Sequence, residues 1–270
     1  MPSGLPLWHL AILALIQGIT EFLPISSSGH LVLAPLVLGV EDQGLLFDIA
    51  VHLGSLVAVC LYFWRETLQL PVGTVKLFTS KRSAPDAKLA LHVILGSIPV
   101  VVAGFTLHSL APGGLRGIEL IAWSTIIFGV LLGIADWIGA KRKSLGTMDR
   151  FDALLIGLAQ ILALIPGTSR SGVTMTMARL IGYTRQEAAR FSLLLAIPAI
   201  GGAAIIGIID VIQLGSWRFG VDLALAALLA GLSAFAAIAV MMRWLAKASF
   251  MPFVIYRLLL GAALLVYLYV

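Results

Sequence analysis

The chain has 270 residues, of which 60% are hydrophobic and 11% charged, with a mean hydropathy of +1.04. Soluble domains carry about a quarter charged residues, so this composition excludes a disordered chain and a soluble globular fold and indicates an integral membrane protein. A single cysteine, Cys60, excludes an internal disulfide, and the net charge of +5 lies in short stretches between apolar segments, which favours membrane topology over nucleic-acid binding.

The first apolar region, residues 7 to 38, is too interrupted to be one spanning helix. We expect a helix from Leu7 to about Leu23, a break over Pro-Ile-Ser-Ser-Ser-Gly at 24–29, and a short helix after it. Proline removes a backbone donor, and irregular backbone at membrane depth persists only where protein or water satisfies it. Glu21 and Pro24 occupy the place of a signal-peptide cleavage site, so we interpret this region as mature protein. The pattern predicts a broken helical hairpin that returns to its starting side.

Six later segments reach the length of about 20 apolar residues that a spanning helix needs. They are approximately Leu46 to Trp64, Leu89 to Leu107, Gly117 to Ile138, Phe191 to Ile212, Leu223 to Met242 and Phe250 to Val270. Between the third and fourth, residues 151 to 182 form a second broken unit with its break at 166–172. The predicted fold is an all-α polytopic membrane protein with six transmembrane helices and two re-entrant broken-helix hairpins.

The two broken units resemble each other in sequence. Gln17 precedes Gly29 by the same spacing as Gln160 precedes Gly172, and each interval holds an apolar stretch, a proline and serines. Phe47 and Phe191 then open the next spanning segment in each half. We expect one membrane domain, 1–270, with an inverted repeat of about 1–138 and 150–270. Three segments separate the units, so they enter from opposite faces and their breaks meet inside the membrane.

Charge favours this re-entrant arrangement over a second unit that crosses completely. With both units re-entrant, the basic residues of the loops lie on one side of the membrane, apart from Arg116 and Arg218. Complete crossing would divide them more evenly. The positive-inside rule therefore predicts that both termini lie outside and that the basic loops at 65–88 and 139–150 are cytoplasmic.

Three ionisable residues at membrane depth are functional candidates, because such groups are expensive there. They are Glu21, His30 and Arg170. Gln17 lies one helical turn before Glu21 on the same face, and oxygen ligands of this kind suit Mg²⁺ or Ca²⁺, which often share them with a phosphate. Alternatively, Gln17 and Glu21 only satisfy backbone groups at the break.

Both breaks resemble anion sites. Ser26, Ser27 and Ser28 precede a half-helix whose N-terminus offers N–H groups and a positive dipole. In the second break, Ser169, Arg170 and Ser171 add hydroxyls and a guanidinium fork for phosphate. A serine cap alone is often only a cap, and Glu21 could neutralise Arg170 without any ligand.

His30 lies within one turn of the serines and can act as acid, base or nucleophile. His52, four residues after Asp48, is a weaker candidate for the outer mouth of the site. Together these residues predict an intramembrane pocket for a phosphate or diphosphate attached to an apolar group. Either Ser27 or His30 could attack phosphorus.

The segment from Gln17 to His30, Gln-Gly-Ile-Thr-Glu-Phe-Leu-Pro-Ile-Ser-Ser-Ser-Gly-His, resembles the first motif of the bacterial undecaprenyl-diphosphate phosphatases, also called bacitracin-resistance proteins. Residues 166–172, Pro-Gly-Thr-Ser-Arg-Ser-Gly, resemble the second, and the resemblance extends to the closing segment 250–257, Phe-Met-Pro-Phe-Val-Ile-Tyr-Arg. It implies hydrolysis of undecaprenyl diphosphate in the bacterial inner membrane, with recycling of the peptidoglycan lipid carrier and bacitracin resistance.

By the same resemblance, Glu21 is a metal-linked or acid-base carboxylate and Ser27 and His30 are the reactive pair. Either His30 attacks phosphorus or Ser27 attacks with His30 as its base, and we favour the second. The implied phosphate clamp is Arg170 with Ser169, Ser171 and Thr174. The resemblance also implies dependence on Mg²⁺ or Ca²⁺, a pocket open to the outer, periplasmic face, and a homodimer. Many family members carry glutamate where this chain has Gln17, so a metal site with two carboxylates is in doubt. A flippase for the same carrier lipid is the alternative function, because inverted repeats with broken helices are a transporter architecture.

Overall fold

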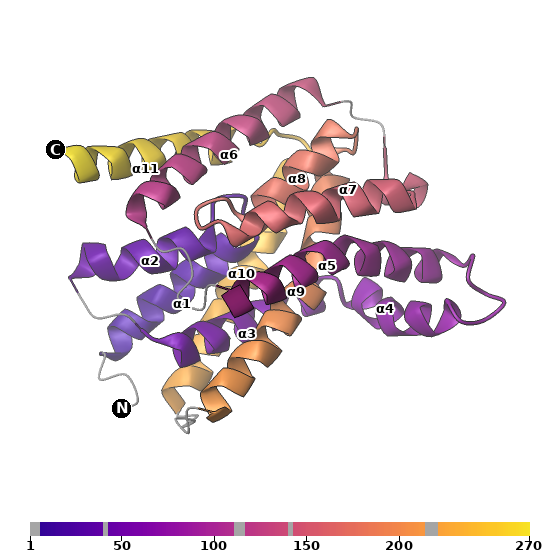
Figure 1. Ribbon diagram of the computed structural model, residues 1–270, viewed down its shortest axis with the longest axis horizontal. Coiled ribbons are helices and arrows are strands. Elements are labelled where there is room, and N and C mark those ends of the chain that lie inside the picture. Colours follow the sequence, from indigo (N-terminus) through magenta and orange to yellow (C-terminus); the bar gives the residue numbers. More distant parts are fainter. Residues whose placement is uncertain (1–5, 40–42, 111–116, 140–142, 214–220) are drawn as a thin grey trace.

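The computed structural model describes residues 6–39, 43–110, 117–139, 143–213 and 221–270, which form helices and the turns between them (Figure 1). The α-helices are α1 (Leu7–Phe22), α2 (Ser27–Leu38), α3 (Leu45–Tyr62), α4 (Trp64–Lys76), α5 (Pro85–Leu110), α6 (Ile118–Ile138), α7 (Arg150–Gln160), α8 (Arg170–Leu180), α9 (Arg185–Gln213), α10 (Val221–Leu245) and α11 (Met251–Tyr269). Two short 3₁₀ helices, η1 (Leu145–Thr147) and η2 (Ile161–Leu164), flank α7.

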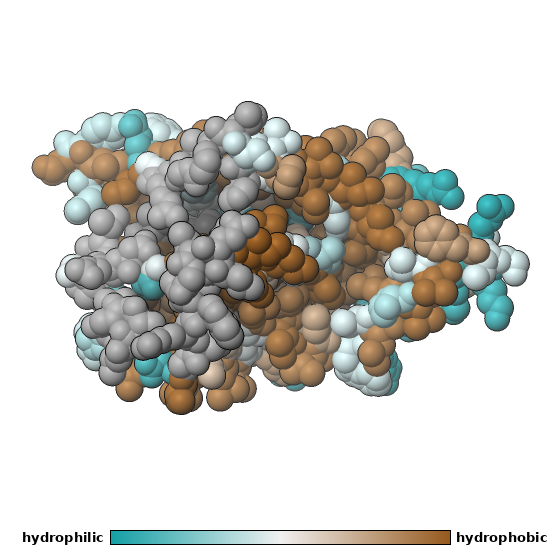
Figure 2. All heavy atoms as spheres, turned by 60° about the horizontal axis from the view of Figure 1, so that its bottom comes forward, coloured by the Kyte–Doolittle hydropathy of each residue, from teal (hydrophilic) through white to brown (hydrophobic). Residues whose placement is uncertain are grey.

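Six helices in the described part of the chain are long and apolar enough to cross a membrane, which confirms the predicted all-α polytopic fold. These spans are Leu45–Tyr62, Pro85–Leu107, Ile118–Ile138, Arg185–Ile209, Val221–Leu245 and Met251–Tyr269. Figure 2 shows hydrophobic atoms across the middle of the molecule and hydrophilic atoms gathered toward its ends. α9 begins at Arg185, so Phe191 lies inside this helix and does not open it as expected. Polar residues in the first turns of α9 extend it beyond its apolar part.

The region 65–88 is not the loop that the sequence predicted, because it contains α4 and the start of α5. α4 exposes an apolar stripe of Trp64, Leu68, Val72 and Val75, spaced by three or four residues as on one helix face. Its other side packs on α5 at Gly73, where a Cβ atom would lie 2.2 Å from the Asp86 carbonyl oxygen. An amphipathic helix of this length lacks the continuous apolar run that marks a spanning segment.

Two helices are broken where the sequence predicts. Residues 23–26 separate α1 from α2, and residues 165–169 separate η2 from α8, so each helix resumes inside the predicted break. In Figure 1, α2 runs back toward the end of the molecule at which α1 begins, and α8 runs back along α7. The return of each unit to its own side of a bilayer stays a prediction.

Equivalent residues and helices recur in the two halves. Ser26 and Ser169 precede α2 and α8 with positive φ angles of 74° and 71°. α10 packs against α1 and α3, while α5 packs against α7 and α9, so the two sets of three helices correspond in order. This correspondence agrees with the predicted repeat, whose boundaries remain a prediction.

A buried charge network fixes the far end of α8. Asp136 of α6 accepts hydrogen bonds from Arg179 Nε at 3.2 Å and from Arg185 Nε at 2.6 Å. The backbone N–H of Phe250 donates to the same carboxylate at 3.0 Å. A buried charge is costly unless other groups pair with it or hydrogen-bond to it, so this network holds α6, α8, α9 and the start of α11 in register.

Candidate functional site

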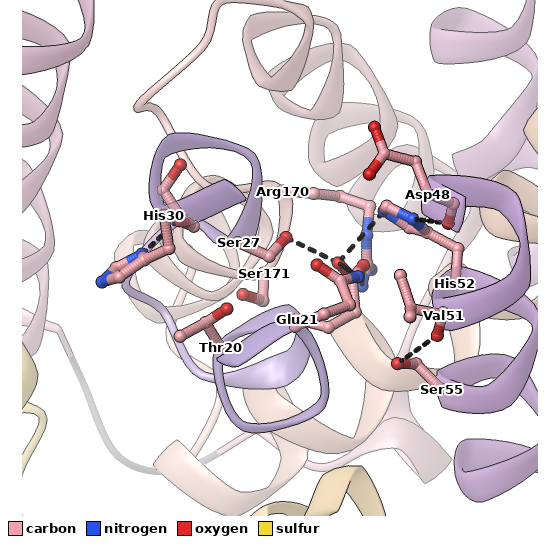
Figure 3. A network of polar contacts seen from close by, with 12 residues as sticks. Thr20, Glu21, Ser27, His30, Asp48, Val51, His52, Ser55, Arg170 and Ser171 are labelled. Atoms are coloured by element: carbon pink, nitrogen blue, oxygen red, sulfur yellow. Dashed lines mark hydrogen bonds and ion pairs between the residues drawn. The ribbon is translucent and has the colours of Figure 1, made fainter. Parts of the chain in front are cut away.

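Glu21 is the centre of a polar cluster between the two breaks (Figure 3). It lies at the end of α1 and is 7% exposed. Its Oε2 accepts hydrogen bonds from Gln17 Nε2 at 2.9 Å and from Ser27 Oγ at 2.6 Å, and its Oε1 lies 3.5 Å from Arg170 Nη2. The carboxylate thus joins side chains from α1, α2 and α8, as expected if the two breaks meet.

Ser27 is the first residue of α2, and its hydroxyl donates to a carboxylate and not to a histidine. The 2.6 Å separation is that of a strong, charge-assisted hydrogen bond. A serine hydroxyl needs a neighbouring base to become a nucleophile. Glu21 is positioned to accept that proton.

Arg170 is the first residue of α8 and reaches the cluster from the opposite side. Its Nη1 donates to the Ser192 carbonyl oxygen at 3.1 Å, and its Nη2 makes the 3.5 Å contact with Glu21. A guanidinium has five N–H donors in a planar fork. Donors therefore remain for a phosphate next to Glu21 and Ser27.

His52 of α3 belongs to the same cluster. The sequence analysis named His52 as a candidate for the outer mouth of the site but did not predict its contact with Glu21. Its Nε2 lies 3.7 Å from Glu21 Oε2, and its Nδ1 is 2.7 Å from the Asp48 carbonyl oxygen. That second contact orients the ring with Nε2 toward the carboxylate. The spacing of Asp48 and His52 was the only signal in the sequence, because contact with Glu21 depends on how α3 packs beside α1.

His30 turns away from Glu21, as Figure 3 shows. Its Nδ1 is 2.7 Å from the Ser26 carbonyl oxygen, and its Nε2 is 2.5 Å from the Tyr256 hydroxyl of α11. The two rings also stack at 5.7 Å between centroids. Among the described hydrogen bonds, none joins His30 to Ser27, so the pair that the sequence analysis favoured is not formed in this arrangement.

The two breaks share a serine cap. Ser169 Oγ accepts a hydrogen bond from the Gly172 N–H at 3.1 Å, and Ser26 Oγ accepts one from the Gly29 N–H at 3.4 Å. A side chain at Gly172 would crowd its serine, because a Cβ there lies 3.1 Å from Ser169 Cβ. The Ser-to-Gly spacing of both motifs is therefore that of an N-cap and the helix residue it caps.

The remaining hydroxyls of the predicted clamp hold the second break in place. Ser171 Oγ donates to the Leu23 carbonyl oxygen at 2.8 Å, which links the two breaks directly. Thr174 Oγ1 donates to the Arg170 carbonyl oxygen at 2.9 Å and lies 2.7 Å from Ser192 Oγ, within hydrogen-bond distance. Ser28 is the first-turn neighbour of Ser27, but its side chain lies outside the described residues.

Arg257 of α11 is a buried support that the sequence analysis missed. Its guanidinium is inaccessible to solvent and donates to five backbone carbonyl oxygens, of Pro24, Ser124, Thr125, Gly167 and Thr168. Three of these belong to the breaks, where helical hydrogen bonds are lost. The arginine therefore supplies the donors that irregular backbone needs inside a membrane protein.

Gln17 and Glu21 are the residues of this cluster that could hold a divalent cation. Gln17 Oε1 is buried and has no hydrogen-bond partner among the described residues, although the amide nitrogen of the same side chain binds Glu21. A buried amide oxygen beside a carboxylate is the hard oxygen pair that Mg²⁺ or Ca²⁺ takes together with a substrate phosphate. No group of three His, Cys, Asp or Glu side chains able to hold a metal occurs in the described part of the chain.

Comparison with known proteins finds a family and relatives that match nearly the whole chain. The family described as bacitracin resistance protein BacA has a model that matches residues 10–263. The undecaprenyl-diphosphatase of Ruegeria pomeroyi is 48% identical over 260 residues, which cover 96% of this chain and 97% of the relative. That of Hahella chejuensis is 49% identical over 265 residues, with 97% and 98% covered. Undecaprenyl-diphosphatase 1 of Rhodospirillum rubrum is 49% identical over 270 residues, with 97% and 95% covered.

Proposed function

The chain belongs to the bacitracin resistance protein family, and on that premise we propose that it hydrolyses undecaprenyl diphosphate to undecaprenyl phosphate and inorganic phosphate. This reaction recycles the lipid carrier of peptidoglycan synthesis and removes the diphosphate that bacitracin sequesters. The observation that carries the proposal is the meeting of Ser27, Glu21 and Arg170 at one point of a multi-pass membrane protein. Nucleophile, base and phosphate-binding cation are the parts that phosphoryl transfer requires.

In the first step, Ser27 Oγ attacks the terminal phosphorus while its proton passes to Glu21, 2.6 Å away. The bond between this phosphorus and the bridging oxygen breaks, and Glu21 gives the proton to the departing undecaprenyl phosphate. In the second step, water attacks the phosphoserine while Glu21 takes its proton. The bond from phosphorus to Ser27 Oγ breaks, Ser27 recovers the proton, and inorganic phosphate leaves.

Arg170 binds the terminal phosphate through the N–H groups that its Ser192 and Glu21 contacts leave free. Its charge is most effective where negative charge develops in the transition state, in a site with little water. Three hydroxyls support this role indirectly, because their hydrogen bonds fix the break next to Arg170. They belong to Ser169, Ser171 and Thr174.

His30 has a supporting role in this mechanism, while the alternative in which His30 itself attacks phosphorus has less support. Both of its ring nitrogens are engaged, one with the Ser26 carbonyl oxygen and one with Tyr256. It thereby steadies Ser26, whose positive φ is unusual for a residue with a side chain, and with it the start of α2 that presents Ser27.

Gln17 and Glu21 would hold Mg²⁺ or Ca²⁺ when it is bound. The cation would supply positive charge to the phosphate oxygens of the substrate. The unpartnered Gln17 Oε1 supports this assignment, and a single carboxylate in the pair favours modest affinity.

An apolar groove beside the second break suits the isoprenoid tail of the substrate. A groove of about 440 Å³ lies between α5 and α9 and includes Leu164 at the end of η2. α9 also carries Ser192, which binds Arg170, so one helix connects the phosphate site with the groove. A tail in this groove would lie against Ala199, Gly202 and Ile206.

We further propose that the protein lies in the bacterial inner membrane with both broken units re-entrant and the site open to the periplasm. The excess of basic residues at the α4–α5 end supports a cytoplasmic position for that end. Lys81 and Arg82 of its turn are exposed, whereas Arg116 and Arg218 lie outside the described residues. The family resemblance also supports a homodimer.

Flipping of the carrier lipid is the second candidate function. The observation that favours it is a related groove of about 520 Å³ between α3 and α10. Gly54, Val57, Ala58 and Leu61 line it with the same spacing as Ala199, Gly202, Ala203 and Ile206 in the other groove. Repeat-related grooves are typical of alternating-access transporters.

The deciding experiment measures phosphate release from farnesyl and undecaprenyl diphosphate by purified protein in detergent, with Mg²⁺, with Ca²⁺ and with EDTA. We expect metal-dependent release by the wild type and its loss in Arg170→Ala and Ser27→Ala. Folded wild-type protein that binds the lipid but releases no phosphate would refute the hydrolase and favour the flippase.

A further inference from the structure

A polar cavity of about 570 Å³ lies between α4, α5, η1 and the start of α9. None of its lining residues contacts Glu21 or Arg170 through a described hydrogen bond or ion pair. Two of the helices that line it, α4 and α5, are joined by the turn on the right of Figure 1. The proposed hydrolysis makes no use of this cavity.

Basic side chains from three helices converge on this cavity: Arg65 of α4, Lys88 of α5 and Arg190 of α9. The only carboxylate in its wall, Glu66, already accepts a hydrogen bond from Arg190 at 2.5 Å. Among the described residues, no ion pair joins Arg65 or Lys88 to a carboxylate. The cavity therefore has an excess of positive charge and suits an anion.

The rest of the wall indicates the kind of anion. Leu89, Leu145 and Met148 give the cavity an apolar side. Arg65 links the cavity to the exposed apolar stripe of α4, because its guanidinium lies 5.2 Å from the centroid of the Trp64 ring. Aromatic residues and long basic side chains in this arrangement are typical of the membrane interface. A phosphate in the cavity would leave an attached acyl chain beside this stripe.

We propose that this cavity binds a phosphate group, carried by an anionic lipid such as phosphatidylglycerol or free in solution. Arg65 and Lys88 supply the unpaired positive charge, and Arg190, held by Glu66 and by Glu187 at 3.5 Å, completes the basic wall. The inference stands apart from the proposed hydrolysis, because it names different residues and a different ligand position.

The test compares two double variants that remove equal charge. R65Q/K88Q changes the cavity, whereas K81Q/R82Q changes the exposed turn between α4 and α5. Thermal unfolding of each protein in detergent is followed against phosphatidylglycerol, phosphatidylcholine and inorganic phosphate. We expect phosphatidylglycerol to stabilise the wild type and K81Q/R82Q against unfolding. Its dissociation constant for R65Q/K88Q should be at least about tenfold higher than for the wild type. Phosphatidylcholine should have little effect.

A response to inorganic phosphate with the same dependence on the two variants would support the site and identify the free anion as a ligand. Because the hydrolytic site also binds phosphate, the contrast between the two variants decides the result. Equal responses of the two variants, or none in the wild type, would overturn the proposal. Farnesyl diphosphate hydrolysis by R65Q/K88Q reports whether the fold is intact, and K88Q alone replaces the double variant if the latter does not fold.

Discussion

Ser26 and Ser169 stand at equivalent positions ahead of α2 and α8, with φ angles of 74° and 71°. They are the only residues other than glycine with positive φ in the described part of the chain. Such backbone costs of order 1–3 kcal/mol for a residue with a side chain. Each serine offsets part of this cost by capping its half-helix, and the same compromise is made in both halves.

Substitution of Ser169 separates the cap from the strain. Ser169→Ala keeps the strain and loses the cap, so unfolding free energy should fall by about 1–2 kcal/mol. Ser169→Gly also loses the cap but relaxes the backbone, so its loss should be smaller. Denaturation in detergent measures both, with Ser233→Ala of α10 as a control for deletion of a helix hydroxyl. A glycine variant less stable than the alanine variant would contradict this account.

Ser27→Ala should reduce phosphate release by about 10³-fold or more, because it deletes the oxygen that we propose attacks phosphorus. Ser55→Ala is the matched control, since this buried hydroxyl on α3 donates only to the Val51 carbonyl oxygen among the described contacts. A terminally labelled substrate should leave label on Ser27 of quenched wild-type enzyme. The label should survive acid, as a phosphoserine does. Acid-labile label on His30 would show that the histidine attacks instead.

Arg170→Lys tests the fork separately from the charge. The lysine retains one positive charge but cannot bind a phosphate with two parallel N–H groups. We expect the value of kcat/KM for undecaprenyl diphosphate to fall by about 10²-fold or more, with metal dependence retained. Arg243→Lys on the exposed face of α10 is the control. Full activity of Arg170→Lys would mean that charge alone suffices.

Arg257→Met should destabilise the protein by at least about 3 kcal/mol, because the buried carbonyl oxygens of both breaks lose their donor. Methionine has similar length and fits an apolar neighbourhood, so steric effects are small. Arg243→Met provides the control on an exposed helix face. Thermal unfolding gives the difference, and hydrogen exchange at residues 23–29 and 165–172 should rise together. Protection lost in only one break would contradict a shared support.

Gly202→Leu tests the tail groove between α5 and α9. Apart from neighbouring atoms of its own helix, nothing lies within 4 Å of a Cβ built at Gly202, so the fold should tolerate the change. The leucine would occupy the groove, and we expect KM to rise several-fold for undecaprenyl diphosphate but little for farnesyl diphosphate. Gly201→Leu is the matched control, because it is equally open but does not line the groove. An equal effect on both substrates would refute the assignment.

The spanning helices were predictable because about 20 apolar residues have few other uses in a chain. The breaks were predictable because proline, glycine and serine cluster at Pro24 and Pro166. The proximity of Glu21 to Arg170 followed from two costly charges in units whose breaks meet. α4 was missed because its apolar residues form a stripe and not a run.

Contacts between distant helices set the remaining features of the site. His52 approaches Glu21 only because α3 packs beside α1, and His30 turns from Ser27 because Tyr256 of α11 offers a hydroxyl. Neither relationship has a trace in local sequence spacing. Proximity along the chain favoured His30 as the partner of Ser27. In the folded protein, the Ser27 hydroxyl instead donates a hydrogen bond to the Glu21 carboxylate.

The position of Arg257 in the chain also determines when, during synthesis, the two breaks can become fully hydrogen-bonded. The Arg257 side chain belongs to α11, which the ribosome makes after the other described helices, yet one of the carbonyl oxygens that it binds, that of Pro24, belongs to the first broken unit. Each break must therefore wait, incompletely hydrogen-bonded, until α11 has entered the membrane. A newly made chain is therefore expected to stay inactive until α11 is in place. A chain truncated before residue 257 carries every residue of the Glu21 cluster but lacks the guanidinium that donates hydrogen bonds to both breaks.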